Sequence, residues 1–592
     1  MAKTRPRRAA DARRALYLLL LLGAAACGPV GHAVSMAGEA TKLTFEGSAR
    51  ELRDDAEPPE AEPPAATGPR LVVLALDGVD RGQLYEMLEA GSLPELAALL
   101  GASGGAFEHA HFEREAMTTL PSSTMVAWAT VMTGVPPAQH GIAGNEFFIR
   151  ETRELAAPVP VSVPETSQVM AIYTEDYVNR LSLAPTVYER MRERRPDLRI
   201  WVAMHQLYRG ADRLLLPDRT ALIETMQVSV EDELRELLTT EEALSLYEEL
   251  DQESIENAVD AISADGTPDV LTVYLAGTDH YAHVSRDGPD VARERYLREA
   301  VDPLVGELRV ALEEAGGLDD TYVVVTSDHG HTQVAHDDRH SLAMEGDDEP
   351  PEVLRRAGFR VRPFALEQER GDFDAVVAYQ GAMAYVYLAD RSTCPEAGQE
   401  CDWSKPPRFR EDVLPAADAF FASDRSGEPV PEMKDTLDLV LVREPRPVPE
   451  PDLPFEAYVG CGRTVPLRAH LARHPMPHYV ALEPRLRDLA VGPAGERAGD
   501  VLLVARNSDR VPIEERHYFS PPYRSWHGSA GRKDSEIPLI VAHRGRTASE
   551  LRRIVGRVAG PAPRQQHVGD LLVALATEDE PARRSAFAAA SP

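Results

Sequence analysis

The stretch that decides the fold is residues 71–78, LVVLALDG, a continuous apolar run that ends in Asp77 and Gly78. Such a run, apolar on both faces, is typical of a parallel strand buried inside a sheet. Two later runs follow the same pattern: residues 270–275, VLTVYL, lead to Asp279, and residues 322–326, YVVVT, lead to Asp328. In an open α/β sheet, ligands bind beyond the carboxyl ends of the strands. The sequence therefore predicts three acidic side chains at one edge of a sheet.

Segments with helical spacing separate these strands and predict the rest of the core. Helices are expected at residues 83–100, 231–262, 292–315 and 568–576, and further strands at residues 198–204 and 537–542. Strands that alternate with helices form an α/β fold, a mainly parallel sheet with helices on both faces. We assign residues 69–331 and 526–576 to this core. Residues 332–525 are proline-rich and loosely patterned, which indicates a large insertion that could cap the site.

Histidines accompany the acids. His283 follows Asp279 by four residues, a spacing that can place both on one helical face, and His329 directly follows Asp328. His527 lies in WHGS, just before the last core strand. Mixed Asp and His sets without Cys suit Zn²⁺ or a similar divalent ion with open positions for a substrate. An ordinary structural role is the simpler interpretation for the remaining histidines near these motifs: His140, His280, His331, His336 and His340.

Residues 120–148, LPSSTMVAWATVMTGVPPAQHGIAGNEFF, contain the candidate nucleophile. A Pro-Ser-Ser turn precedes the apolar residues 125–132, which predict a short helix with Thr124 at or near its N-terminus. The free N–H groups and the dipole at that end of a helix favour an anion. A lone Thr in this setting is most simply a helix cap. With metal ligands nearby, its hydroxyl becomes a candidate nucleophile.

Charge excludes one class of partner. The chain has 592 residues and a net charge of −33 at pH 7, with the acidic residues spread along its length. Such a surface repels nucleic acid, so we expect no nucleic-acid partner. It also slows the approach of phosphate-bearing substrates. A phosphate site in this chain therefore needs strong local positive charge, which metal ions would supply.

The N-terminal residues predict export. A basic segment precedes residues 15–26, ALYLLLLLGAAA, which are too few to span a bilayer and end at Cys27. This order resembles a bacterial lipoprotein signal with lipid on Cys27; an ordinary secretory signal is the alternative. We assign residues 1–27 to the signal and lipidated Cys, residues 28–68 to a disordered tether and residues 577–592 to a disordered tail. The expected location is the cell envelope, with contact to the membrane through the N-terminal lipid only. In that oxidising compartment Cys394 and Cys401 could form a disulfide.

These motifs together resemble the alkaline phosphatase superfamily, in particular its type I phosphodiesterases and nucleotide pyrophosphatases. The resemblance rests on LDGVD, the Thr124 segment with TGVPPAQHG, and then GTDHYAH, SDHG and WHGS, in this order. It implies two divalent metal ions, expected to be Zn²⁺, and Thr124 as the nucleophile. One ion would be held by Asp279, His283 and His527. The other, beside Thr124, would be held by Asp77, Asp328 and His329. Asn145, in GIAGNEFF, would donate to a non-bridging phosphate oxygen.

The resemblance implies a phosphohydrolase, and we expect a phosphodiesterase that forms a phosphothreonine at Thr124 and acts on a small phosphoester. Residues 125–128 are MVAW, where similar diesterases carry Phe-Pro-Asn-His. The resemblance therefore does not determine which leaving group the pocket accepts. A branch of Thr-using monoesterases grips the phosphate with a Lys, and this chain has no Lys between Lys42 and Lys405. That difference favours a diester substrate.

Several alternatives stay open at this point. An arginine could replace the missing Lys, and the candidates are Arg180, Arg209 and Arg213. The same site could belong to a phosphomonoesterase or a phosphonate hydrolase. The chain could also be a non-catalytic envelope protein that binds a phosphorylated ligand. The oligomeric state is not determined by these motifs.

Overall fold

The computed structural model describes residues 68–162, 167–216, 240–342, 350–364, 371–444 and 453–577. The predicted signal segment and nearly all of the predicted tether and tail lie outside these ranges. None of the helices within them has the length and apolar character that crossing a bilayer requires.

The first sheet has seven strands in the order β2-β17-β8-β1-β7-β5-β6. β1, β7, β8, β5 and β6 run parallel to one another, whereas β17 is antiparallel to both of its neighbours. The strands are Arg70–Leu76 (β1), Ala110–Glu113 (β2), Ile200–Ala203 (β5), Arg213–Leu215 (β6), Val270–Leu275 (β7), Thr321–Ser327 (β8) and Leu539–Ala542 (β17). The predicted mainly parallel sheet is confirmed.

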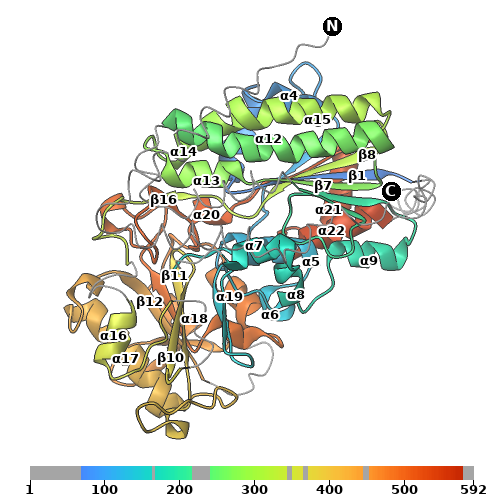
Figure 1. Cartoon of the computed structure of the whole chain (residues 1–592). Helices are drawn as coiled ribbons and strands as arrows, with labels where there is room; N and C mark the ends of the chain where they lie inside the picture. Colours follow the sequence, from blue (N-terminus) through green and yellow to red (C-terminus); the bar gives the residue numbers. More distant parts are fainter. Residues whose placement is uncertain are drawn as a thin grey trace, which may run out of the picture.

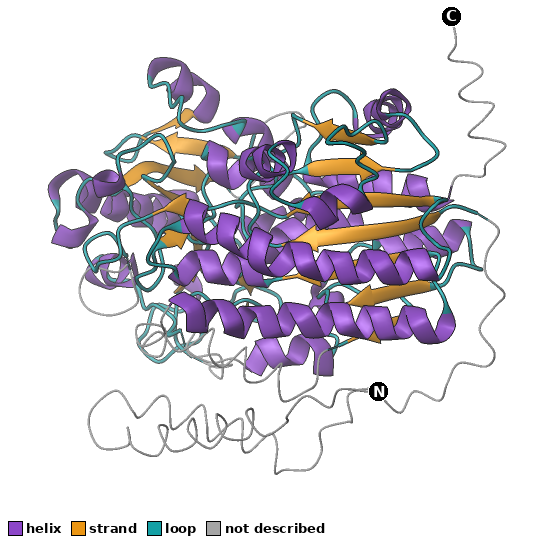
Figure 2. Ribbon diagram, turned by 90° about the horizontal axis from the view of Figure 1, so that it is seen from above, coloured by secondary structure: helices purple, strands orange, loops and turns teal. Residues whose placement is uncertain are grey.

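Helices cover both faces of this sheet (Figure 1). The even-numbered apolar residues of β1 belong to one hydrophobic core and the odd-numbered ones to another, because successive side chains of a strand point to opposite faces. Figure 2, seen from above, shows long helices lying over the sheet and running in roughly the same direction as its strands. The first layer consists of α3 (Arg81–Glu89), α4 (Pro94–Leu99), α12 (Thr240–Asp265), α14 (Pro289–Tyr296) and α15 (Asp302–Glu314). The second consists of α5 (Thr124–Thr133), α9 (Val187–Arg194), α21 (Ala548–Ala559) and α22 (Gln565–Thr577).

Two predicted helices differ in detail. Residues 83–100 form two helices, α3 and α4, because Gly91 adopts a left-handed φ of 73° and Pro94 starts a new helix. Residues 292–315 are covered by α14 and α15, joined by a π-helical turn at Leu297–Val301.

A second sheet lies below the first in Figure 1 and comes from residues 375–505. Its order is β10-β11-β15-β12-β13-β14, and every neighbouring pair is antiparallel. The strands are Ala375–Tyr379 (β10), Met383–Leu388 (β11), Leu437–Arg443 (β12), Phe455–Tyr458 (β13), Thr464–Pro466 (β14) and Val501–Ala505 (β15). One face packs against α16 (Pro350–Arg356) and α17 (Leu414–Ser426), and the other joins the core that contains α5.

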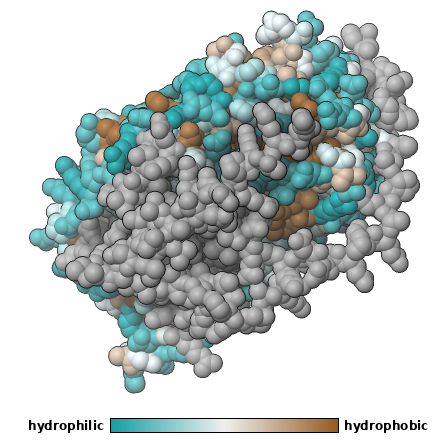
Figure 3. Space-filling view, turned by 45° about the horizontal axis from the view of Figure 1, so that its top comes forward, coloured by the Kyte–Doolittle hydropathy of each residue, from teal (hydrophilic) through white to brown (hydrophobic). Residues whose placement is uncertain are grey.

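The remaining features of the fold are the cysteines and the surface. Cys394 and Cys401 form a disulfide after β11, and Cys461 is exposed and free. The face shown in Figure 3 is largely hydrophilic where the structure describes it, as the acidic composition predicts. The acidic side chains predicted to form a ligand site belong to the carboxyl edge of the first sheet.

Candidate active site

The carboxyl ends of three neighbouring strands meet at one place, as predicted. β1 lies between β7 and β8, so the loops that follow these strands are adjacent. Asp77 directly follows β1, Asp328 directly follows β8, and Asp279 lies in α13 (Gly277–Val284), the helix after β7. All three carboxylates are buried. The parallel topology thus gathers three acids that are far apart in the sequence.

The first candidate metal group contains Asp77, Asp328 and His329. His329 Nε2 lies 3.2 Å from Asp328 Oδ2 and 3.8 Å from Asp77 Oδ1. Thr124 is the first residue of α5, directly after its N-cap Ser123, and its hydroxyl lies 3.2 Å from His329 Nε2. The candidate nucleophile therefore stands at a helix N-terminus and beside this group.

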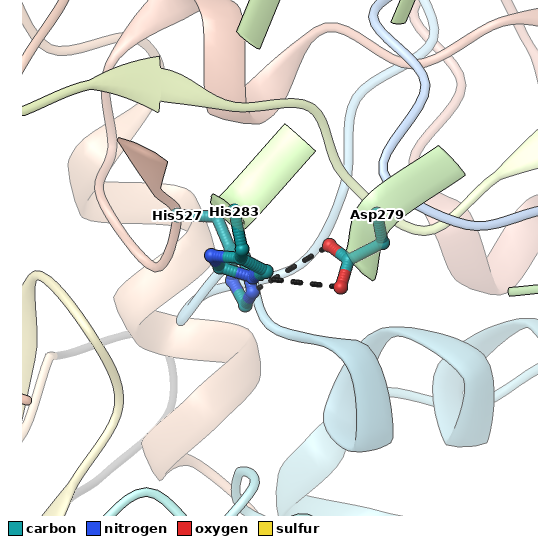
Figure 4. Close-up of side chains that lie close together, drawn as sticks. All are labelled: Asp279, His283 and His527. Carbon is teal, nitrogen blue, oxygen red and sulfur yellow. Dashed lines mark ion pairs between the residues drawn. The ribbon is translucent and has the colours of Figure 1, made fainter. Parts of the chain in front are cut away.

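The second candidate metal group contains Asp279, His283 and His527. His283 Nε2 lies 3.4 Å from Asp279 Oδ2, and His527 Nε2 lies 3.9 Å from Asp279 Oδ1. Figure 4 shows both imidazoles turned toward this carboxylate. The rings of His527 and His329 stack with their centroids 3.7 Å apart, so the two groups adjoin. All seven residues predicted as metal ligands lie in this one cluster.

The three predicted histidine ligands share one hydrogen-bonding arrangement. Each donates from Nδ1 to a backbone carbonyl: His283 to Ser525 (2.8 Å), His527 to Ser122 (3.0 Å) and His329 to Gly330 (3.2 Å). Because a carbonyl only accepts, Nδ1 carries the proton and Nε2 presents its lone pair to the cluster. Metal-binding histidines typically donate their other ring N–H in this way.

His140 has the opposite arrangement. Its Nδ1 accepts from the N–H of Ile142 at 3.2 Å, and its Nε2 lies 3.0 Å from the hydroxyl of Thr130, which itself donates to the Val126 carbonyl at 2.7 Å. His140 therefore donates from Nε2 and ties the loop after α5 to that helix. It lies outside every candidate metal group of the described residues.

The carboxylates are suited to bind cations. Asp77 Oδ1 and Asp328 Oδ2 are buried and accept no hydrogen bond from the described residues. The other oxygen of Asp77, Oδ2, accepts from the Tyr274 hydroxyl and from Trp128 Nε1, the latter at 3.4 Å. Across the described ranges, the three carboxylates form ion pairs with histidines and with no Lys or Arg. Buried anionic oxygens without such partners are costly unless metal ions bind beside them.

The pKa values of the cluster follow first from burial and, for the two carboxylates, also from neighbouring negative charge. Burial, and then the charges of Asp328 and Asp279, raise the pKa of Asp77 well above its ordinary value. Burial and the charge of Asp279 likewise raise the pKa of Asp328. Burial lowers the pKa of His329 and of His527, which keeps both rings neutral, the form that binds a metal.

His331, to which the sequence analysis gave an ordinary structural role, also lies in the cluster and belongs with Asp279 and His329 to a third candidate metal group. This fully buried residue places Nε2 2.7 Å from Asp279 Oδ1 and Nδ1 3.1 Å from the Ser525 hydroxyl. His331 directly precedes β9 (Thr332–Gln333), which pairs with β16 (Ser525–Trp526).

The other histidines with an assumed structural role are not candidate ligands. His280 lies 3.9 Å from Asp279 Oδ2, but its ring stacks on Tyr247 with the centroids 5.4 Å apart. His340 binds Asp337 at 2.6 Å. Neither these two nor His336 belongs to a candidate metal group of the described residues.

Asn145 lies beside the nucleophile. Its side chain is buried, and Oδ1 accepts from the N–H of Met125, the residue after Thr124, at 3.0 Å. The carbonyl end of the amide is therefore occupied, and the NH₂ end is left to donate.

The arginines proposed as substitutes for Lys bind elsewhere. Arg180 pairs with Glu175, Arg209 with Glu189, and Arg213 with Asp265. None of them forms an ion pair with a member of the cluster in the part of the chain that the structure describes.

Three solved structures are similar to this chain over most of its length. An inactive variant of murine ectonucleotide pyrophosphatase / phosphodiesterase 5 in complex with AMP is 12% identical, covers 86% of this chain and 96% of its own, and gives a TM-score of 0.46. A mutant of alkaline phosphatase PafA is 16% identical, with 82% and 93% covered and a TM-score of 0.48. Phosphonoacetate hydrolase from Sinorhizobium meliloti in complex with phosphonoformate is 17% identical, with 87% and 97% covered and a TM-score of 0.41.

The family assignment depends on the sequence match. Residues 71–404, more than half of the chain, match the profile of the family described as type I phosphodiesterase / nucleotide pyrophosphatase. This range includes most of the cluster described above, from Asp77 to His331. The resemblance noted in the sequence is confirmed, and the chain belongs to the type I phosphodiesterase / nucleotide pyrophosphatase family of phosphoester hydrolases.

Proposed function

We propose that this protein is an exported, zinc-dependent phosphodiesterase that works through a phosphothreonine at Thr124. The observation that carries the proposal is the placement of the Thr124 hydroxyl, 3.2 Å from His329 Nε2 and beside two adjoining groups of candidate ligands. Asp77, Asp328, His329 and Thr124 would hold one ion. Asp279, His283 and His527 would hold the other. A set of Asp and His without Cys suits Zn²⁺.

The residues of the cluster account for the reaction. Divalent ions bound there would activate the Thr124 hydroxyl and a water molecule, and would neutralise charge on the transferring phosphoryl group. Thr124 Oγ1 forms a bond to phosphorus while the bond to the leaving group breaks, and water then cleaves the phosphothreonine. The N-terminus of α5 presents its dipole to the phosphoryl oxygens. Asn145 donates its amide NH₂ to a non-bridging oxygen, where it meets charge that develops during transfer.

The charge of the cluster supports a diester substrate. A phosphate diester carries one negative charge near neutral pH, whereas a monoester carries close to two. Two divalent ions would offset the charge of the three carboxylates, but among the described residues no Lys or Arg pairs with these carboxylates to add further positive charge. A substrate with less negative charge is therefore favoured over a phosphomonoester.

Export is part of the proposal. Residues 1–27 carry the signal-like sequence and lie outside the described residues. The disulfide between Cys394 and Cys401 supports an oxidising compartment such as the bacterial envelope.

Turnover of aryl phosphates by the zinc-loaded protein tests the reaction. Thr124→Ala should abolish hydrolysis of a bis-aryl phosphate while two metal ions per chain remain bound. Thr133→Ala is the matched control, because Thr133 is buried on the same helix and donates to the Ala129 carbonyl at 2.6 Å. Wild-type kcat in Thr124→Ala would end the nucleophile assignment.

The substrate class is decided by comparing two esters. We expect a higher kcat/KM for the bis-aryl phosphate than for the mono-aryl phosphate. The reverse order would favour the phosphomonoesterase alternative. No turnover of mono-, di- or phosphonate esters by zinc-loaded protein would favour a non-catalytic binding protein.

A further inference from the structure

The turn between β10 and β11, residues 380–382, reaches from the second sheet into the site. Gln380, at its start, is 1% exposed. Its Oε1 accepts from the N–H of Asn145 at 2.8 Å, and its Nε2 donates to the carbonyl of Glu146. One side-chain amide therefore holds two successive residues of the loop that contains Asn145.

The approach of Gln380 depends on a glycine. A Cβ atom built on Gly144 would lie 1.9 Å from Gln380 Oε1, closer than any side chain allows. Any residue other than glycine at this position would displace the amide of Gln380 from Asn145. The contact therefore depends both on the amide of Gln380 and on the absence of a side chain at Gly144.

The same turn also contacts the loop of a candidate metal ligand. The N–H of Ala382 donates to the carbonyl of His527 at 3.1 Å. A Cβ on Gly528 would lie 1.9 Å from the Gln380 carbonyl, and Gly528 has a left-handed φ of 99°. Residues that are nearly four hundred positions apart, Asn145 and His527, are therefore set against one hairpin of the second sheet.

We propose that Gln380 is a positioning residue for phosphoester hydrolysis, and that it acts by fixing the place of Asn145 relative to Thr124. Asn145 lies in a loop between α6 (Pro137–His140) and β3 (Phe147–Ile149), and its Oδ1 is tied to the N–H of Met125. A donor on a loop must be held from outside to meet the transferring phosphoryl group in the productive geometry. The hydrogen bonds of Gln380 supply this support. The inference depends on the proposed function, because Asn145 acts there as the donor.

Gln168 provides a matched control. Its Oε1 accepts from the N–H of Ala157 at 2.6 Å and from the Tyr177 hydroxyl at 2.9 Å, and its Nε2 donates to the Leu155 carbonyl at 3.1 Å. It therefore holds a backbone segment in the same two-point manner as Gln380. No residue of the candidate metal groups takes part in these hydrogen bonds.

A double-mutant cycle tests the proposal, with turnover of a bis-aryl phosphate as the first readout. Gln380→Met keeps the length of the side chain and removes both hydrogen bonds. It should lower kcat/KM about tenfold, because misplacing a group at a reacting centre slows the reaction strongly. Bound zinc should stay at the wild-type amount. Gln168→Met should leave kcat/KM at the wild-type value. In an Asn145→Ala background, Gln380→Met should cause no further loss, since its effect passes through Asn145.

Hydrogen exchange supplies a readout that does not depend on activity. In Gln380→Met, a peptide that contains the Asn145 N–H should exchange faster than in wild type, because the acceptor of that N–H is gone. Gln380→Glu retains an acceptor for this N–H and loses the donor to Glu146, so it should lose less activity than Gln380→Met.

Three results would overturn the inference. They are additive effects of Gln380→Met and Asn145→Ala, unchanged exchange at the Asn145 peptide, and an equal loss in Gln168→Met. In each case an active wild type would leave the proposed function standing. A wild type without any phosphoester turnover would instead remove the proposed function, and this inference with it.

Discussion

The two sheets of this molecule contribute to the site in different ways. In the first sheet, parallel strands end at the same edge, so β1, β7 and β8 bring Asp77, Asp279 and Asp328 together. In the second sheet, every pair is antiparallel, so neighbouring strands end at opposite edges and cannot gather side chains in this way. The second sheet provides no residue of the candidate metal groups among the described residues. Parallel topology collects reactive groups here, and the antiparallel hairpin supports them.

The largest expected effect is the difference between mutating an acidic residue of the first sheet and mutating one of the second. Asp328→Asn should remove measurable turnover and lower the number of bound metal ions, because it takes a negative charge from a candidate ligand. Asp438→Asn, on β12, should keep the wild-type turnover and the wild-type number of bound metal ions. Asp438 accepts from His478 Nε2 and the Tyr479 hydroxyl, each at 2.9 Å, so its loss should lower the melting temperature. Elemental analysis, turnover and thermal unfolding of both variants check this. A comparable loss of metal in Asp438→Asn would break the comparison.

The next effect concerns the donor beside Thr124. Asn145→Ala should lower kcat about 10²-fold, the usual consequence of removing one donor to developing charge. Zinc content should stay unchanged, since Asn145 is no metal ligand. Asn507→Ala is the control, because Asn507 is buried beyond β15 and donates from Nδ2 to the His517 carbonyl at 3.0 Å. We expect that control to retain kcat. Loss of zinc in Asn145→Ala would contradict the assigned role.

A smaller effect is expected at His331. Its contact with Asp279 orients a candidate ligand, and loss of such a partner typically weakens metal binding about 10- to 100-fold. His331→Gln should show this weakening in a competition titration with a chelator. His478→Gln, which loses a contact with Asp438 in the second sheet, should bind zinc like wild type. Equal affinities of wild type and His331→Gln would show that His331 only fills space.

The smallest expected effect is a difference in the sign of the pH dependence, measured by urea unfolding of the metal-free chain. Burial raises the pKa of Asp251, a residue of α12, to about 7; its carboxyl faces the Tyr296 hydroxyl at 3.0 Å, the N–H of Ala276 at 2.9 Å and the charge of Glu248. The unfolded chain releases this proton near pH 4, so the free energy of unfolding should fall as pH rises from about 4 to about 7. Asp251→Asn should reduce this decrease of the free energy of unfolding with pH. Burial also raises the pKa of Asp534 to about 7, so the contribution of Asp534 to the same decrease should remain in the variant.

The second sheet should show the opposite sign. Burial opposes the charge of Asp438, but hydrogen bonds from His478 and Tyr479 and the charge of Arg506 outweigh it and lower its pKa. Its contribution to stability is therefore complete above about pH 4 and lost as pH falls through the lowered value. Asp438→Asn should flatten the acid side of the stability curve. The same slope in both variants would contradict this assignment of signs.

The sequence predicted the elements that have a local signature. Residues 270–275 coincide with β7, because a fully apolar run bounded by polar residues is what a covered parallel strand requires. The three acids followed from their positions at strand ends, whereas the division of the ligands into two metal groups came from the resemblance to the family. The antiparallel direction of β17 could not be predicted, since its four apolar residues fit either direction. The contact of His331 with Asp279 could not be predicted, because it depends on how the segment after β8 packs against α13. Gln380 has no local signal at all, because only tertiary contact brings it to Asn145.

The place of β17 in the first sheet affects how the protein is made. β17 comes from residues 539–542 and lies between β2 and β8. His527 also lies late in the sequence, before β17, so the ribosome has translated most of the chain before either is available. A nascent chain therefore carries Asp77, and from residue 328 onward also Asp328, without the histidine that completes the pair of metal groups until residue 527 is made. A product that stops before residue 539 would also leave the edge of β8 uncovered, where it can pair with strands of other chains.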